Sequence, residues 1–138
     1  MASILKVDEL QGIVSAGNIT VTSEGGSATQ SLQQGLAKSW VTVNQTGTQA
    51  VRDSLNVSSI TDVQTGSTTV TVSNAMSNSD FSMTNGIHTP SGITWPAWGS
   101  AVGGATPSTT IYQIGAWDYT GNYLDTSYNH GTIHGDLA

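Results

Sequence analysis

The chain has 138 residues, the length of one ordinary domain, and only 9% of them are Asp, Glu, Lys or Arg, against about 25% in typical soluble domains. Three basic against nine acidic residues give a formal net charge of −6, which argues against nucleic acid as a partner because duplex binding needs clustered positive charge. With no cysteine and no apolar stretch near ~20 residues, the sequence predicts no disulfide, no membrane insertion and synthesis in a cytoplasm.

The first 27 residues combine a short apolar stretch with an alternating run. Residues 18–22 predict a strand, with Ile19 and Val21 on its buried face. A Gly-Gly-Ser sequence at 25–27 then separates this segment from the rest. We interpret residues 1–27 as an attachment segment, because its apolar stretch is one that a following domain does not need. The residues of that stretch are Ile4, Leu5, Val7 and Leu10.

Residues 28–38 predict one short helix, with Ser27 or Thr29 as its N-cap and Lys38 near its negative end. Its apolar stripe is narrow and, at so few turns, must pack on something to be stable in water. One alternative is the sheet of its own chain. The other, which a narrow stripe suits better, is a bundle of three copies about an axis. The predicted oligomerisation residues are Ala28, Leu32, Leu36 and Trp40.

From residue 39 onward the apolar pattern has a period of two. Residues 40–44 predict a strand with Val41 and Val43 on one face. Residues 60–63 and 68–72, joined by a glycine-containing turn, predict an antiparallel hairpin. Further along, residues 110–117 predict another strand. Alternating short strands of this kind are typical of a small antiparallel sheet structure.

The segment between residues 87 and 107 carries all three prolines and predicts a long loop. Long loops without secondary structure are often functional. Trp95 and Trp98 are candidates to present flat apolar faces to a sugar or protein partner, together with Tyr112 from the following strand. The alternative is that both Trp rings fold back and cover one end of the sheet.

Metal and catalytic sites are not predicted. Asp118, Asn122 and Asp125 offer oxygens, but their spacing fits a polar turn better than a calcium loop. His130 and His134 lie ~13 Å apart on a strand, too far to share one ion. The sequence holds no Gly-x-Ser-x-Gly elbow, phosphate loop or His-Glu-x-x-His motif. We therefore expect no metal, no cofactor and no enzymatic activity.

Two stretches carry a family resemblance: SWVTVNQTGT at residues 39–48 and VRDSLNVSSITD at 51–62. They resemble a module of marine bacteriophage tail-fibre-like proteins, as does the hairpin that follows through residues 74–76. Shorter similarities lie in LKVD at 5–8 and GDLA at 135–138. The resemblance covers about two-thirds of the chain, and residues 87–110 depart from it.

What the resemblance implies is a virion structural protein, a homotrimer without catalytic residues that is assembled in the host cytoplasm. Its expected partners are other copies of itself and other virion proteins such as capsid or tail proteins. A host surface glycan is a further candidate partner. The attachment residues named above are then expected to anchor the chain to the particle.

The sequence thus predicts an all-β fold, a small antiparallel β-sandwich over residues 39–138 with seven to nine strands. It is preceded by an attachment segment at 1–27 and a short trimerisation helix at 28–38. The expected function is a short trimeric fibre or appendage on a phage particle. The alternatives are a capsid decoration or cement protein and a carbohydrate-binding module.

Overall fold

The computed structural model describes residues 5–14, 19–88, 98–99, 106–118 and 120–138, with the backbone alone at 98–99. Within these residues the protein is mostly β, as the sequence predicts, and its strands pair antiparallel. The chain divides into two compact units, Met1–Leu36 and Ala37–Ala138. Each unit is described by itself below.

The first unit is built on a small hairpin. Strand β1 (Thr20–Thr22) pairs antiparallel with β2 (Thr29–Ser31). The turn between them places Gly26 at φ +70°, a conformation that glycine adopts without steric cost. A single helical turn, α1 (Leu32–Gly35), follows directly, and the Ser31 hydroxyl caps it by accepting the Gln34 N–H at 3.4 Å.

The predicted helix over residues 28–38 is therefore wrong in its extent. Three of its residues form strand β2 instead, because their hydroxyl and amide side chains suit a two-stranded ladder as well as a helix. Only four residues remain helical, and Leu36 already has extended backbone. The expected apolar stripe of Ala28, Leu32 and Leu36 does not exist as a helical face, since Ala28 precedes β2 and Leu36 follows α1.

The predicted burial of Val21 is also wrong, because its side chain is 48% exposed. The hairpin has two strands, and within the described residues of this unit no second layer covers its face. Ile19 is half-buried and precedes β1. The alternation identified the strand but not a buried face.

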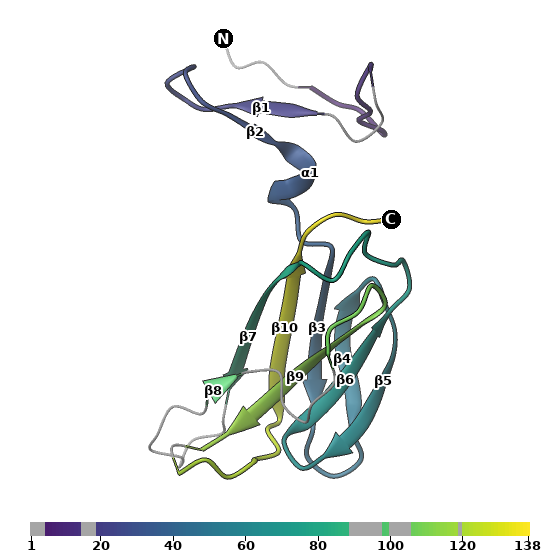
Figure 1. Ribbon diagram of the computed structural model, residues 1–138, viewed down its shortest axis with the longest axis vertical. Helices are drawn as coiled ribbons and strands as arrows, with labels where there is room; N and C mark the ends of the chain where they lie inside the picture. Colours follow the sequence, from purple (N-terminus) through teal and green to yellow (C-terminus); the bar gives the residue numbers. More distant parts are fainter. Residues whose placement is uncertain (1–4, 15–18, 89–97, 100–105, 119) are drawn as a thin grey trace. The chain divides into compact units, whose positions relative to one another are not determined.

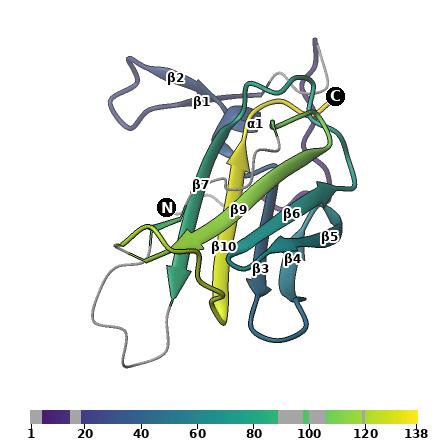
Figure 2. The same ribbon diagram turned by 60° about the horizontal axis from the view of Figure 1, so that its bottom comes forward.

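The second unit is a sandwich of two four-stranded sheets (Figure 1). The first, here called the β3 sheet, has the strand order β4-β3-β10-β7. Its members are β3 (Ser39–Asn44), β4 (Ala50–Leu55), β7 (Ser82–His88) and β10 (Tyr128–His134). The second, the β9 sheet, has the order β5-β6-β9-β8. Its members are β5 (Val57–Gln64), β6 (Ser67–Val72), β8 (Trp98–Gly99) and β9 (Ile111–Trp117). Figure 2 shows the strands of one sheet crossing those of the other obliquely.

The chain passes from one sheet to the other at Asn56, which lies between β4 and β5 with φ 55°. Asparagine tolerates this left-handed conformation better than most residues. Its side chain also fixes the corner: Nδ2 donates to the Lys38 and Asn74 carbonyls at 3.0 and 3.1 Å, and Oδ1 accepts the Asn74 N–H at 2.7 Å. This one residue therefore sets the switch between layers.

The predicted hairpin is confirmed as β5 and β6, and the predicted strand at 110–117 is confirmed as β9. Gly66, in the turn of the hairpin, has φ +70° and leaves no room for a side chain, because a Cβ there would lie 2.5 Å from the Ala116 carbonyl oxygen. The Gly66 N–H donates to Asp125 Oδ1 at 2.6 Å. The turn is thus held by residues about 60 positions further along the chain.

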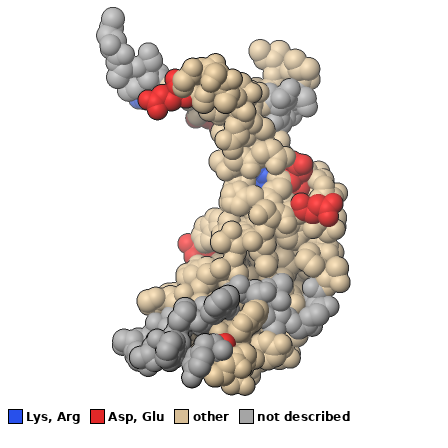
Figure 3. Space-filling model, turned by 60° about the vertical axis from the view of Figure 1, so that its left-hand side comes forward, with Lys and Arg blue, Asp and Glu red and all other residues tan. Residues whose placement is uncertain are grey.

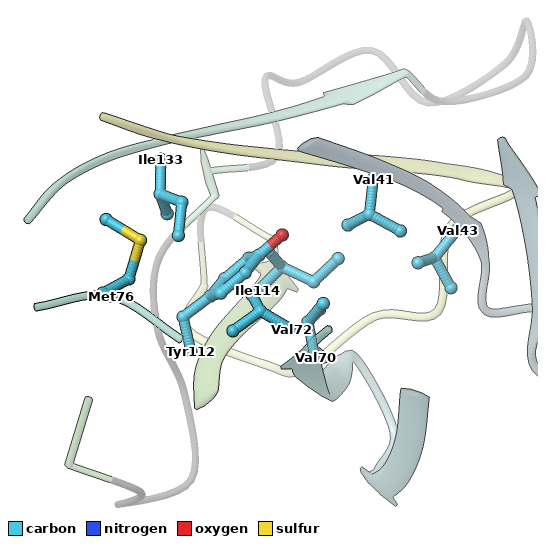
Figure 4. Close-up of a cluster of buried hydrophobic side chains, with 8 residues drawn as sticks. All are labelled: Val41, Val43, Val70, Val72, Met76, Tyr112, Ile114 and Ile133. Carbon is cyan, nitrogen blue, oxygen red and sulfur yellow. The ribbon is translucent and has the colours of Figure 1, made fainter. Parts of the chain in front are cut away.

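The hydrophobic core lies between the two sheets (Figure 4). Val41, Val43 and Ile133 come from the β3 sheet and are at most 1% exposed. Opposite them, the β9 sheet contributes its own apolar side chains, and Met76 closes one end. The β9-sheet members are Val70, Val72, Tyr112 and Ile114. The predicted inward face of residues 40–44 is confirmed. Each such side chain stabilises the fold by roughly 1.5–3 kcal/mol relative to exposure.

Candidate functional site

The predicted attachment residues lie exposed in the first unit. Leu5 is 79% exposed, Val7 55% and Leu10 53%, whereas Ile4 lies outside the described residues. Two further apolar side chains, Ile13 and Val14, are even more exposed, at 104% and 91%. No described residue between 5 and 36 is fully buried. This unit therefore carries an apolar surface that its own described residues do not cover.

The four predicted oligomerisation residues fall in both units. In the first unit, Leu32 is half-buried and Leu36 is 54% exposed. Together with Val21 they line a shallow groove of about 240 Å³. Ala28 is exposed and lies outside that groove. Trp40 belongs to the second unit, where it is half-buried on β3 and pairs with Leu55 and Thr132 on the neighbouring strands.

Tyr112 is not available as a ligand contact, which corrects the prediction. Its side chain is 1% exposed within the core, because the alternation of β9 turns it inward with Ile114. The hydroxyl lies 3.2 Å from Ser39 Oγ, and burial raises the pKa of this phenol above its ordinary value despite that hydrogen bond. Trp95 lies outside the described residues. Trp98 is described only by its backbone, which pairs with Trp117.

A network of hydrogen-bonded, uncharged polar side chains runs through the sandwich, and the sequence analysis did not predict it. Gln45 lies at its centre and is 1% exposed. Its Oε1 accepts hydrogen bonds from Thr126 Oγ1 at 3.2 Å and from Asn129 Nδ2 at 3.1 Å. Its Nε2 donates to Thr68 Oγ1 at 3.1 Å. Asn85 extends the network, donating to Asn129 Oδ1 at 2.8 Å and accepting the Gly115 N–H at 2.9 Å. The network links both sheets without any ion pair among these residues.

The turn after β9 is held by hydrogen bonds between polar groups. The Asp118 carboxylate accepts from the Thr120 hydroxyl at 2.6 Å and from the Asn122 N–H at 3.0 Å. These hydrogen bonds, the Thr120 hydroxyl foremost, lower the pKa of Asp118 below its ordinary value. Asp125 is engaged with Gly66. In the part of the chain that the structure describes, no three metal-ligating side chains lie together.

The outer face of the β3 sheet gathers aromatic and imidazole side chains. The Arg52 guanidinium carbon lies 4.2 Å from the centroid of the Tyr128 ring, and its Nε donates to the Ser127 carbonyl at 2.9 Å. His88 meets the Tyr128 ring edge to face with centroids 5.7 Å apart, and His130 stacks near it at 6.3 Å. We call these four residues, Arg52, His88, Tyr128 and His130, the Arg52 cluster.

Strand register explains why these residues meet. On β10, Asn129, Gly131 and Ile133 face the core and are buried, so Tyr128 and His130 share the outer face. Tyr128 lies opposite His88 of β7. His130 lies opposite Thr42 of β3, whose hydroxyl is 3.0 Å from His130 Nδ1. The alternation at 128–134 could have indicated this face, but the sequence alone did not reveal which strands would adjoin it.

The structure contains, among its described residues, no helix long and apolar enough to cross a membrane. No protein-family model matches the sequence, and no curated protein or solved structure is significantly similar to it.

Proposed function

We propose that this chain is a non-enzymatic structural protein of a bacteriophage particle, a short homotrimeric fibre or appendage. It assembles through its N-terminal unit and presents its sandwich at the surface of the virion. One observation carries the proposal: the apolar side chains of residues 5–14 are 53–104% exposed, in a unit with no fully buried described residue.

The two units differ in whether they can stand alone. A unit of about 36 residues cannot bury enough of its own surface, and chains below roughly 40 residues usually need disulfides, metals or oligomerisation. This chain has no cysteine. Full burial of five large apolar side chains is worth roughly 10 kcal/mol. We propose that association with other chains supplies that energy.

Two further points support a virion protein with three copies. The stretches at 39–48 and 51–62 resemble the phage fibre module, whose members are trimers. Two exposed residues, Val21 and Leu36, and half-buried Leu32 form a narrow apolar surface, which suits a symmetric seam between copies. The low charge of the chain fits a surface designed for contact among like subunits, and Figure 3 shows few acidic or basic side chains on the face it presents.

The test is the oligomeric state of the full chain by light scattering and native mass spectrometry. We expect a trimer for the natural sequence and monomers for the double variant Leu5→Ser/Leu10→Ser. The matched control is Val51→Ser/Leu55→Ser, which removes two apolar side chains that are 40% and 46% exposed in the second unit. That control stays trimeric. A stable monomer of the natural sequence at high concentration contradicts the proposal.

The same assembly can serve as a fibre or as a capsid decoration protein, and copy number in purified particles separates the two. A decoration protein is present in hundreds of copies, and a fibre in tens. Absence of the chain from every particle preparation contradicts both.

A further inference from the structure

We propose that the Arg52 cluster is a binding site for the carboxylate or sulfate group of an acidic polysaccharide. The site lies on the outer face of the β3 sheet, away from the residues that the sequence singled out for ligand contact. Recognition of the anion follows from the cluster itself. The choice of a polysaccharide as its carrier rests on the proposed display at a particle surface.

Arg52 is set apart by the charge distribution of the chain. Only three residues are Lys or Arg. Lys6 belongs to the first unit, and Lys38 is 6% exposed. Arg52 is thus the one exposed Lys or Arg of the described sandwich. The net charge of the protein is −6. Within the sandwich, an anionic group is therefore attracted to the guanidinium of Arg52.

The guanidinium is held in place but not neutralised. Its Nε donates to the Ser127 carbonyl, and its central carbon lies 4.2 Å from the centroid of the Tyr128 ring. Neither anchor uses the two terminal nitrogens, Nη1 and Nη2, which have no partner within the described part of the chain. The adjacent carboxylate of Asp53 instead accepts the Ser54 N–H at 2.8 Å. The free edge of a guanidinium presents two parallel N–H groups, the geometry that binds carboxylate or sulfate bidentately.

The surroundings of Arg52 add donors suited to a sugar acid. His130 uses Nδ1 toward Thr42, and its Nε2 has no partner among the described residues. His88 is exposed and touches the same Tyr128 ring. Imidazole, phenol and threonine hydroxyl groups on one flat face can hydrogen-bond the hydroxyls of a pyranose beside its acidic group. The site is open, so a single contact is weak, and a trimer gains through multivalency.

The test is a titration of the full chain, followed by NMR shifts of the Arg52 Nε–H and the His130 ring. The probes are a tetragalacturonate, a sulfated tetrasaccharide of the carrageenan type, neutral maltotetraose and inorganic sulfate. We expect both acidic oligosaccharides to bind and maltotetraose not to bind. Inorganic sulfate should bind at least about tenfold more weakly than either. Sulfate binding as tight as that of the oligosaccharides, or equal binding of maltotetraose, overturns the proposal.

Three variants sharpen the test. Arg52→Gln should weaken acidic oligosaccharide binding at least about tenfold, and Arg52→Lys should weaken it less, because a lysine keeps the charge but not the paired donors. Lys6→Gln, which removes the other exposed cation, should leave it unchanged. Unchanged binding in Arg52→Gln overturns the site. Repeating the titration with Leu5→Ser/Leu10→Ser separates the proposed trimer from the proposed anion site. The Arg52 cluster of each chain should still bind the acidic oligosaccharides when the protein is a monomer.

Discussion

The two units of this protein are made from nearly the same kind of sequence, yet among the described residues a buried core is found in the second unit and not in the first. The first unit has exposed Leu, Val and Ile side chains and a two-stranded sheet. The second has, among its described residues, nine hydrophobic residues at most 6% exposed, which are enclosed by two four-stranded sheets. A low content of charged residues and short alternating strands are therefore not enough to form an independently stable fold. Closure of one sheet by another is what buries the apolar face.

The sandwich also shows how a sparsely charged protein holds its interior together. Apart from Lys38, the buried polar side chains of its described residues are amides and hydroxyls, among them Gln45, Thr68, Thr126 and Asn129. Uncharged groups cost less to bury than ions when their hydrogen bonds are made. The first unit has no such interior among its described residues. The comparison between the two units can be tested by substitutions in the core of the sandwich and by removal of the first unit.

The largest effect is expected for Gln45→Ala. The change removes the partner of Thr68, Thr126 and Asn129 at once and leaves a cavity, so the free energy of unfolding should fall by about 3 kcal/mol or more. Chemical denaturation measures it. Gln64→Ala, at an exposed position of β5, should change it by less than about 0.5 kcal/mol. Equal effects of the two substitutions contradict the role of the buried network.

Gly131→Ala should destabilise the sandwich by about 1–3 kcal/mol. A Cβ at Gly131 would lie 2.5 Å from Ile114 Cγ2 and 3.2 Å from Tyr112 Cε2, so the two sheets must move apart. The matched control is Gly86→Ala, opposite His130 on the same sheet, where a Cβ meets nothing within 4 Å. If both variants unfold at the same denaturant concentration, the close packing at Gly131 does not contribute to the stability of the sandwich.

Tyr112→Phe should lower the free energy of unfolding by about 1 kcal/mol at neutral pH, because Ser39 Oγ loses its buried partner. The pKa of Tyr112 is raised in the fold above its unfolded value near 10. Its contribution is therefore complete below about pH 10 and declines as the pH rises through the raised value. The difference between the natural protein and the variant should narrow in that alkaline range.

The control for this prediction is Tyr123→Phe, at a residue 47% exposed. It should change the free energy of unfolding by less than about 0.5 kcal/mol at neutral pH. The prediction is contradicted if the difference in free energy of unfolding between the natural protein and Tyr112→Phe stays constant up to strongly alkaline pH. In that case the ionisation of the buried phenol is not coupled to folding.

Removal of residues 1–36 should change the free energy of unfolding of the sandwich by less than about 1 kcal/mol while abolishing the trimer, because the core residues all lie in the second unit. Denaturation of the truncated protein, at several concentrations, measures both. Loss of the folded sandwich on truncation would mean that the two units are not independent.

The smallest effect is local and lies in the turn at Asp118. Because hydrogen bonds lower the pKa of this carboxyl, its stabilisation of the turn is present above the ordinary value near 3.8 and is lost as the pH falls through the lowered value. We expect protection of the Thr120 and Asn122 amides from hydrogen exchange to fall in that range. Asp118→Ala should remove this protection at neutral pH as well, whereas Asp62→Ala should not.

The strands were predictable wherever a periodic run met a second sheet. Residues 40–44, the hairpin at β5 and β6 and strand β9 follow directly from alternation. The same reasoning failed at Val21, where alternation is equally regular but no layer covers it. The prediction for Tyr112 was also wrong. Its aromatic ring suggested a ligand contact, but Tyr112 lies two residues from Ile114 on the same strand, so both side chains point into the core. The helix was overextended because three hydroxyl and amide residues were free to join a hairpin.

What the sequence by itself determined is the class of the fold, since period-two patterning, glycine turns and the scarcity of charge are local properties of the chain. The tertiary structure alone decided which residues meet across long separations. Gln45 reaches Asn129, Asp125 holds the turn at Gly66, and Arg52 lies over Tyr128. Those pairings depend on strand order and register, which short-range pattern does not encode because a strand can present the same face to any neighbour.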